Sequence, residues 1–169
     1  MSVTYHTARP DDAPALAELG AATFVATFGH LYQPGDLALF LTSHTPEAWA
    51  KELADPAFAV RIAEAGGVMI GYAKLGPPHL PFEPRGEAAE LRQLYVIEQY
   101  KGAGIARTLI DWVIARARDA RAEHLYLSVF TDNHRARRFY EKLGFEAEGS
   151  YAFMVGNHAD EDIVMRLRL

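Results

Sequence analysis

Cysteine is missing from all 169 residues of the sequence. Disulfides, zinc–thiolate sites, iron–sulfur clusters and cysteine nucleophiles are therefore excluded, and a cytoplasmic location is the simplest expectation. The seven histidines are scattered without the close spacing of metal ligands, so we expect no bound metal. No serine lies in a Gly-x-Ser-x-Gly pattern, which removes a nucleophile elbow.

Long apolar runs and an excess of basic residues are missing as well. No stretch approaches the roughly 20 continuous apolar residues of a membrane span. The start, "MSVTYHTARPDD", lacks the charged and then apolar pattern of a secretory signal. With a net charge of −5, the chain also lacks the basic balance typical of nucleic-acid binders. We therefore expect neither a membrane nor a nucleic acid as partner.

What is present indicates one domain over residues 1–169, because 50% of the residues are hydrophobic and such a chain can bury a sizeable core. Hydrophobic periodicity predicts an α/β (α+β) fold. A strand–helix–strand order near the middle implies a right-handed crossover and a local parallel pair. We expect a mixed sheet of six or seven strands with helices on both faces. The predicted order is a strand (2–9), helices (12–55), three strands (57–65, 68–75, 88–97), a helix (104–119), a strand (124–130), a helix (133–143) and two strands (a short one from 145, then 161–169).

The turn before the central helix carries Gly102 and Gly104 in the string "QYKGAGIAR". A helix N-terminus has unpaired amides and the positive end of the helix dipole, so it suits a phosphate or diphosphate. Glycine leaves those amides uncovered and permits unusual dihedral angles, while Lys101 and Arg107 add positive charge. A plain strand-to-helix turn explains the same glycines equally well. The string matches neither a Walker A loop nor a dinucleotide fingerprint.

"QYKGAGIA" resembles the Gln/Arg-x-x-Gly-x-Gly/Ala signature of the GCN5-related N-acetyltransferase (GNAT) family, with Gln99, Gly102 and Gly104 at the defining positions. Asn133 and the later string "FYEKLGF" are also similar to that family. The resemblance implies a mostly antiparallel GNAT sheet in which one parallel strand pair splays apart. It also implies acetyl-coenzyme A (acetyl-CoA) as the acetyl donor, without a metal.

The same resemblance assigns residues to the donor. The pantetheine arm would pair with the backbone of Leu94 and Val96 in the splay, and Asn133 would hydrogen-bond it. The diphosphate would meet the amides of the glycine turn. The implied donor-binding residues are Leu94, Tyr95, Val96, Gln99, Lys101, Gly102, Ala103, Gly104, Ile105, Ala106, Arg107 and Asn133.

Acetyl transfer to an amine requires control of two protons. An amine with a pKa near 10 is protonated at neutral pH, and removing its proton costs about 4 kcal/mol. The resemblance suggests Glu90 as the base, directly or through a water, although a substrate-binding or purely structural carboxylate stays open. It suggests Tyr140 as the acid that meets the departing sulfur, and a core position beside Phe139 is the alternative.

The motifs do not identify the acceptor amine. The flanking strings "TFVATFGHLYQPGDLALFL" and "FMVGNHADEDIVMRLRL" are similar to bacterial spermidine/spermine acetyltransferases, which favours a small polyamine-like molecule. An acetyltransferase of protein N-termini or lysines and a non-catalytic CoA-binding module remain as rivals, and edge strands near the C-terminus leave a homodimer open. The acidic string at 159–162 is expected to be solvated, with attraction of a polycation as the alternative. Phe24, Phe28, Tyr32 and Phe40 would wall an acceptor pocket or form ordinary core.

Overall fold

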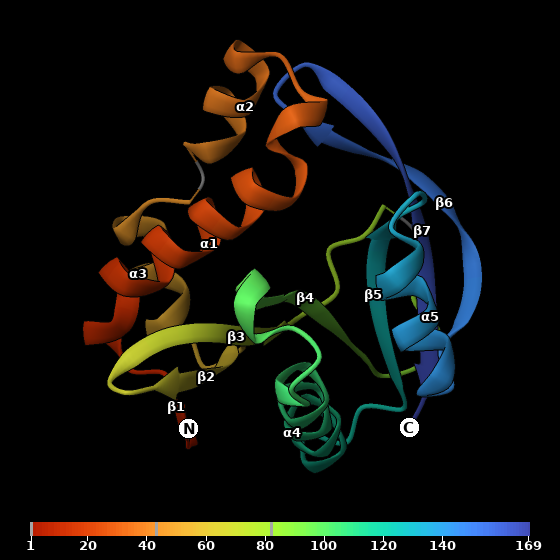
Figure 1. The fold of residues 1–169 in the computed structure, drawn as a ribbon. Helices are drawn as coiled ribbons and strands as arrows, with labels where there is room; N and C mark the ends of the chain where they lie inside the picture. The colour runs from red at the N-terminus through yellow and green to blue at the C-terminus, as the bar shows by residue number, and fades with distance from the viewer. Residues whose placement is uncertain (1, 43, 82) are drawn as a thin grey trace.

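A seven-stranded sheet in the order β1-β2-β3-β4-β5-β7-β6 forms the centre of the computed structural model, which describes residues 2–42, 44–81 and 83–169 (Figure 1). Only β4 and β5 pair in parallel among these strands, which confirms the predicted mixed, mostly antiparallel sheet. The elements are β1 (Val3–Thr7), α1 (Ala13–Phe28), α2 (Pro34–Leu41), α3 (Pro46–Ala54), β2 (Ala59–Ala65), β3 (Val68–Gly76), β4 (Ala88–Val96), α4 (Ile105–Asp119), β5 (His124–Phe130), α5 (His134–Lys142), β6 (Glu146–Val155) and β7 (His158–Arg168).

Helices cover both faces of the sheet, as the sequence predicted. The apolar stripe of α4, with Leu109 and Val113 fully buried, packs on one face, and α5 joins the same core. On the other face α1 and α3 bury Leu16 and Trp49 against Tyr72 of β3. Each fully buried side chain of this size contributes about 1.5–3 kcal/mol. The sheet is therefore held between two apolar layers.

The parallel pair parts in the middle of the sheet. Pairing between β4 and β5 is confined to three register positions, and the last joins Glu90 to Tyr126. Beyond that point β4 continues to Val96 and stays paired with β3, where Gly71 faces Val96. β5 continues to Phe130 and stays paired with β7. The predicted splay is therefore present, and it opens a wedge between two well-supported strands.

The C-terminal hairpin differs from the expectation in two ways. The short strand predicted from Phe145 is instead the ten-residue β6, whose weak hydrophobic alternation follows from its exposed position at the sheet edge. The strand β7 was predicted to be half-buried, yet Val164 and Met165 face opposite sides and are both 2% exposed. The reason is that both faces of β7 are covered, Val164 by the cluster around Tyr126 and Met165 by the core under α4 and α5.

The tip of this hairpin is fastened to α2. The backbone N–H of Asn157 donates to Oδ1 of Asp36 at 2.9 Å, and the ring of Phe40 lies 5.7 Å from that of Phe153. A Cβ atom on Gly156 would stand 2.5 Å from both Cα and O of Asp36, so only glycine permits this approach. The arm formed by α1 and α2 thus reaches the tip of the β6–β7 hairpin, at the end of the sheet where β4 and β5 are apart (Figure 1).

We predict that Gly156→Ala destabilises the protein more than Gly66→Ala does. The two glycines have φ values of 60° and 59°, so both substitutions suffer the same left-handed strain of about 1–2 kcal/mol. A Cβ on Gly66 meets nothing within 4 Å, whereas one on Gly156 meets the backbone of α2 and should add about 1–3 kcal/mol. Urea unfolding of both variants measures the difference, and equal losses would contradict the close packing of α2 on the hairpin.

Candidate active site

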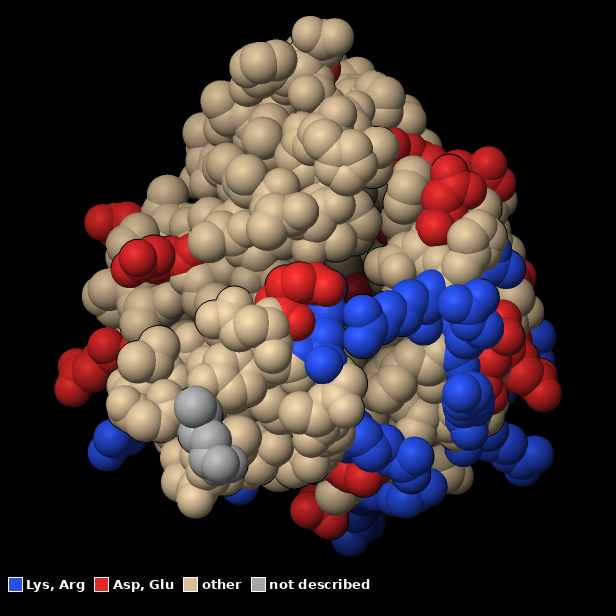
Figure 2. All heavy atoms as spheres, in the orientation of Figure 1, with Lys and Arg blue, Asp and Glu red and all other residues tan. Residues whose placement is uncertain are grey.

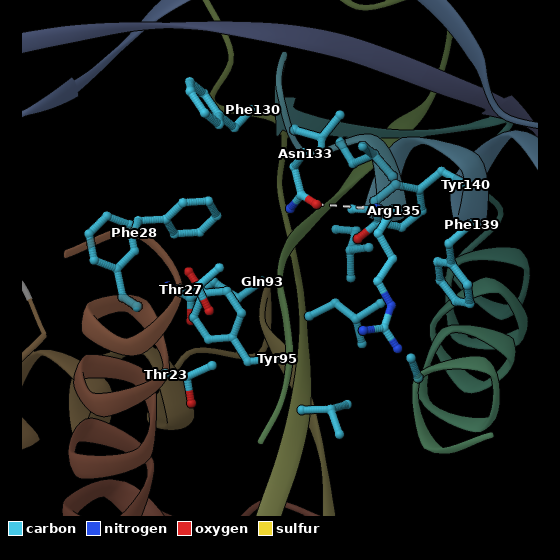
Figure 3. Close-up of a pocket in the computed structure, with 18 of the residues that line it drawn as sticks. Thr23, Thr27, Phe28, Gln93, Tyr95, Phe130, Asn133, Arg135, Phe139 and Tyr140 are labelled. Atoms are coloured by element: carbon cyan, nitrogen blue, oxygen red, sulfur yellow. Dashed lines mark hydrogen bonds between the residues drawn. The ribbon is translucent and has the colours of Figure 1, made fainter. Parts of the chain in front are cut away.

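A cavity of about 450 Å³ occupies the splay between β4 and β5. The helix α1 lines it from one side, α5 and the start of α4 line it from the other, and β4 and β5 lie between them. In Figure 2 the surface is hollowed here, between the α1–α2 arm and α5. Figure 3 shows Thr23, Thr27 and Phe28 facing Asn133, Arg135, Phe139 and Tyr140 across the space, with Gln93 and Tyr95 between the two groups.

The turn into α4 has the backbone geometry that its glycines predicted. Gly102 and Gly104 have φ values of 84° and 83°, in the region where other residues lose about 1–2 kcal/mol. A Cβ on either glycine would meet nothing within 4 Å, so the space in front of the turn is open. Gly104 is the N-cap, and no side chain caps α4. The first amides of α4 therefore form an uncovered anion site at the edge of the cavity.

Positive side chains surround this turn, but two of them are already paired. Lys101 Nζ lies 2.9 Å from Glu98, and Arg107 Nε lies 3.0 Å from Asp111. Arg135 of α5 also lines the cavity, and among the described residues it forms no ion pair within 4.0 Å. Figure 2 shows Lys and Arg side chains gathered over α5 and the start of α4. The sequence reasoning missed Arg135, whose only signal was its place two residues after Asn133.

The strand β4 turns free backbone groups toward the splay. The N–H of Ile97 donates to the carbonyl of Ile70 at 2.9 Å, and Tyr95 faces Tyr72 in the register with β3. Because alternate residues of an antiparallel strand bond to the same neighbour, Leu94 and Val96 direct their N–H and C=O groups to the opposite side. That side is where β5 has moved away. An extended ligand with amide groups would fit there as an added strand.

Most of the predicted site residues meet at this cavity. Those in its described lining are Leu94, Tyr95, Val96, Lys101, Gly102, Gly104, Ile105, Ala106, Arg107, Asn133 and Tyr140. Gln99 and Ala103, which belong to the segment between β4 and α4, are outside that lining, and so is Glu90.

Glu90 is buried, with 2% exposure, but its carboxylate is engaged elsewhere. It accepts the backbone N–H of His79 at 3.0 Å, and the His79 ring nitrogen lies 2.8 Å away. Arg92 Nε is a further 3.6 Å neighbour. The loop between β3 and β4 therefore holds Glu90 outside the cavity wall. Its role as base stays a prediction without direct geometric support.

Tyr140 and Asn133 both reach the cavity from α5. Burial raises the pKa of the Tyr140 hydroxyl above its usual range, and nearby Tyr95 adds to the effect, so Tyr140 stays protonated and can donate. No hydrogen bond to that hydroxyl is found among the residues described. Asn133 caps α5 by accepting the N–H of Ala136 at 3.3 Å through Oδ1. This leaves the amide nitrogen of Asn133, which points into the cavity in Figure 3, available as a donor.

The half of the cavity under α1 is aromatic. Phe24, Phe28 and Tyr32 line it, as expected if these residues wall a pocket. Phe40 is outside the described lining and packs behind Phe24, with 4.5 Å between the ring centroids. Phe130 and Phe153 complete the aromatic wall. The sequence reasoning missed both, because they come from the ends of β5 and β6, which approach α1 only in the folded chain.

Two carboxylates lie in this aromatic wall. The expectation that residues 159–162 are solvated is confirmed for Ala159 and Glu161, which are exposed, and is wrong for the other two residues. Asp160 is 9% and Asp162 is 6% exposed. The hydroxyl of Tyr32 donates to Asp160, and Nε2 of His158 lies 3.1 Å from the same carboxylate. Burial, followed by the charge of Asp160, raises the pKa of Asp162 to about 7. The string "ADED" gave no sign of this depth, which arises because alternate residues of β7 face α1.

Within residues 2–42, 44–81 and 83–169, no three or more acidic or histidine side chains are grouped closely enough to hold a metal ion. None of the helices in these ranges has the length and apolar character needed to cross a membrane.

Comparison with known proteins points to one family. Residues 25–145 match the acetyltransferase (GNAT) family. An uncharacterised N-acetyltransferase of Mycobacterium tuberculosis is 36% identical over 157 residues, which cover 91% of this chain and 96% of the relative. The N-alpha-acetyltransferase RimI of the same organism is 36% identical over 107 residues, 62% of each chain. The crystal structure of the PaiA N-acetyltransferase of Thermoplasma acidophilum in complex with coenzyme A shares the fold, with a TM-score of 0.80 and 20% identity over 100% of both chains.

The raised pKa of Asp162 predicts an unusual dependence of stability on pH. An unfolded aspartate titrates near 3.9, so between about pH 4 and pH 7 the folded state binds a proton that the unfolded state has released. Proton binding by Asp162 therefore contributes to the free energy of unfolding at low pH, and this contribution is lost as the pH rises to about 7. Asp162→Asn cannot ionise. It should therefore be more stable than the wild type at pH 8 by about 1 kcal/mol or more, roughly 2–4 °C in Tm.

Thermal unfolding of Asp162→Asn and the wild type between pH 4 and pH 8 checks this. The gain should disappear near pH 4. Asp119→Asn, at the exposed end of α4, is the control and should show no such trend. A constant difference between Asp162→Asn and the wild type at every pH would mean that Asp162 titrates normally.

Proposed function

The chain belongs to the acetyltransferase (GNAT) family as an N-acetyltransferase with acetyl-CoA as its co-substrate, and we propose that its acceptor is the primary amine of a small polyamine-like molecule. The observation that carries the acceptor class is the pair of buried carboxylates, Asp160 and Asp162, in the aromatic half of the cavity.

The donor half of the cavity fits coenzyme A in three respects. The diphosphate suits the uncovered amides after Gly102 and Gly104, because neither glycine places an atom in front of them. Arg135 adds a cation at the same corner. The pantetheine arm, which contains amide groups, suits the free backbone of Leu94 and Val96. We propose that these groups hold acetyl-CoA, which supplies the acetyl group as a reactive thioester.

We propose that transfer is direct, with both substrates in the cavity together. The absence of cysteine removes the usual nucleophile for an acyl-enzyme. Tyr140 is buried, protonated and in the cavity wall, so its hydroxyl is the group that can donate to the sulfur as the carbon–sulfur bond breaks. A thiol is a modest leaving group with a pKa near 8.5, so one donor suffices.

The acceptor half fits a slender cation. Buried carboxylates are costly unless a positive charge accompanies them, and aromatic faces also attract ammonium groups. Phe28 and Phe130 border the space in an edge-to-face pair with centroids 6.2 Å apart, and Phe24 is close beside Phe28 at 5.3 Å. An alkyl chain with an amine at its end combines the two properties that these walls select.

A peptide N-terminus is the second candidate, because one relative at 36% identity is an N-alpha-acetyltransferase. A peptide would need an open groove for its backbone. Here Asp36 of α2 contacts Gly156 and Asn157 of the β6–β7 hairpin, and these contacts join two segments near the acceptor end. This junction favours a small molecule over a chain that must extend out of the site.

The acceptor class is tested by incubating the protein with acetyl-CoA and separate amines and following the release of free thiol. We expect spermidine or spermine to react at least about tenfold faster than free amino acids, whose carboxylate would be repelled by Asp160 and Asp162. Peptides with free N-termini should also be slow. Thiol release with the peptides alone would contradict a small polyamine-like acceptor.

We predict that Tyr140→Phe keeps its affinity for coenzyme A and lowers kcat by about 100-fold or more, the usual range for loss of a general acid. The ring and its packing are retained, so the protein should remain folded. Tyr5→Phe on β1, far along the sheet order from the cavity, is the matched loss of a tyrosine hydroxyl and should leave kcat unchanged. Calorimetric titration with coenzyme A together with steady-state kinetics measures both effects. Normal turnover in Tyr140→Phe would exclude the acid role.

A further inference from the structure

We propose that Asp162, assisted by Asp160, receives the acceptor ammonium, and that the Asp162 carboxylate takes the proton that must leave before the amine can react. This assignment rests on the proposed function and deepens it, because it names the residues that recognise and activate the acceptor. It also assigns the general base to Asp162 and not to Glu90, the residue that the family resemblance suggested.

Position along the sheet favours Asp162. Glu90 faces Tyr126 at the last paired position before the splay. Asp162 faces Phe130, four residues farther along β5, which is roughly 13 Å at about 3.3 Å per residue. At that level β4 has reached the region of Leu94, where its free backbone borders the wedge. Asp162 therefore lies level with the open part of the splay and lines its cavity, whereas Glu90 lies at the closed end and outside the described lining.

The charge around Asp162 is unbalanced. Neither Asp160 nor Asp162 has a Lys or Arg nitrogen within 4.0 Å among the described residues, and both are more than nine-tenths buried. Asp160 is satisfied by Tyr32 and His158. Asp162 relies on a hydrogen bond with Ser128, which only partly offsets its burial. A cationic ligand is the group that this wall lacks, because two adjacent buried carboxylates otherwise repel one another.

The other titratable groups near Asp162 leave the carboxylates as the acid–base pair. Besides Asp160 on β7, the groups coupled to it are Tyr32 after α1, Tyr95 on β4 and Tyr151 on β6. Burial raises the pKa of each tyrosine, that of Tyr95 to about 12, so all three keep their protons at neutral pH. A carboxylate whose pKa lies near 7 is well matched to accept a proton under the same conditions.

Asp162 and Tyr140 are electrostatic neighbours of the same residue. The charge of Asp162 raises the pKa of Tyr95, and Tyr95 in turn raises that of Tyr140. All three line the cavity. Asp162, the proton acceptor, and Tyr140, the proton donor, therefore border the same cavity, and Tyr95 interacts with both. A transfer between two bound substrates requires such a shared space.

The proton balance is complete with these two residues. Asp162 takes one proton from the ammonium, and the freed nitrogen lone pair forms the bond to the acetyl carbon. The carbon–sulfur bond breaks with its electron pair going to sulfur, and Tyr140 gives its proton to that sulfur. Tyr140 recovers a proton from the acylated nitrogen, and Asp162 releases its proton to solvent.

Three variants of the full chain test the assignment, with the polyamine found to react best as acceptor. Asp162→Asn should bind coenzyme A like the wild type and lose about 100-fold or more in kcat/KM at pH 7. The wild-type kcat/KM should rise with pH and level off above about pH 7, whereas that of Asp162→Asn should keep rising toward pH 10, as free amine becomes abundant. Recovery at high pH marks a missing base and is not expected from damaged packing.

Asp160→Asn provides an independent reading if Asp162→Asn folds poorly. The charge of Asp160 helps to raise the pKa of Asp162, so its removal should move the rising limb of the pH profile to lower pH. The KM for the amine should increase at the same time, with little change in kcat. Glu90→Gln tests the rival base, a second buried carboxylate on the same sheet, and the assignment to Asp162 requires that the wild-type pH limb survive this change.

The outcomes separate the two levels of the proposal. If the wild type acetylates no small amine, the proposed acceptor class fails and the assignment of Asp162 fails with it. If the wild type acetylates polyamines but Asp162→Asn retains the wild-type profile, the assignment alone is overturned. The same holds if Glu90→Gln removes the pH limb, which would make Glu90 the base.

Discussion

The separation of β4 from β5 is the constraint on which the site depends. A strand inside a sheet normally satisfies both of its edges, and buried backbone groups left without partners are costly. Here β4 keeps its bonds to β3 through Val96 and loses those to β5 beyond Glu90. The separation leaves Leu94 and Val96 with a free edge inside the molecule. That edge creates the space for an extended ligand and brings the start of α4, α5 and the start of β7 around one cavity.

The charges around this cavity are divided between its two ends. One end has the uncovered amides of the glycine turn and the cation of Arg135, and it suits an anionic donor. The other end has Asp160 and Asp162 within an aromatic wall, and it suits a cationic acceptor. Tyr95 and Tyr140 lie in the wall that both ends share. Opposite charges at the two ends orient two different substrates toward one reacting point.

The acceptor end exists because distant segments meet over it. The arm of α1 and α2 reaches the tip of the β6–β7 hairpin, where Gly156 allows the backbone of Asp36 to approach closely. Phe40 packs on Phe153 behind the same wall. Burial of Asp162, followed by the charge of Asp160, raises the pKa of Asp162 to about 7. Stability is therefore given up at the place where we propose that the acceptor ammonium binds.

The amino-acid sequence by itself determined the strand and helix order and the positive φ angles at Gly102 and Gly104, because periodicity and glycine act over a few neighbouring residues. Only the tertiary structure decided which carboxylate enters the cavity. Glu90 and Asp162 are both acidic residues on strands, and their surroundings come from other segments of the chain: His79 engages Glu90, whereas Asp162 shares the cavity wall with Tyr32, which follows α1, and with Tyr95 of β4. Burial and charge pairing depend on these long-range contacts, which a local pattern of residues does not encode.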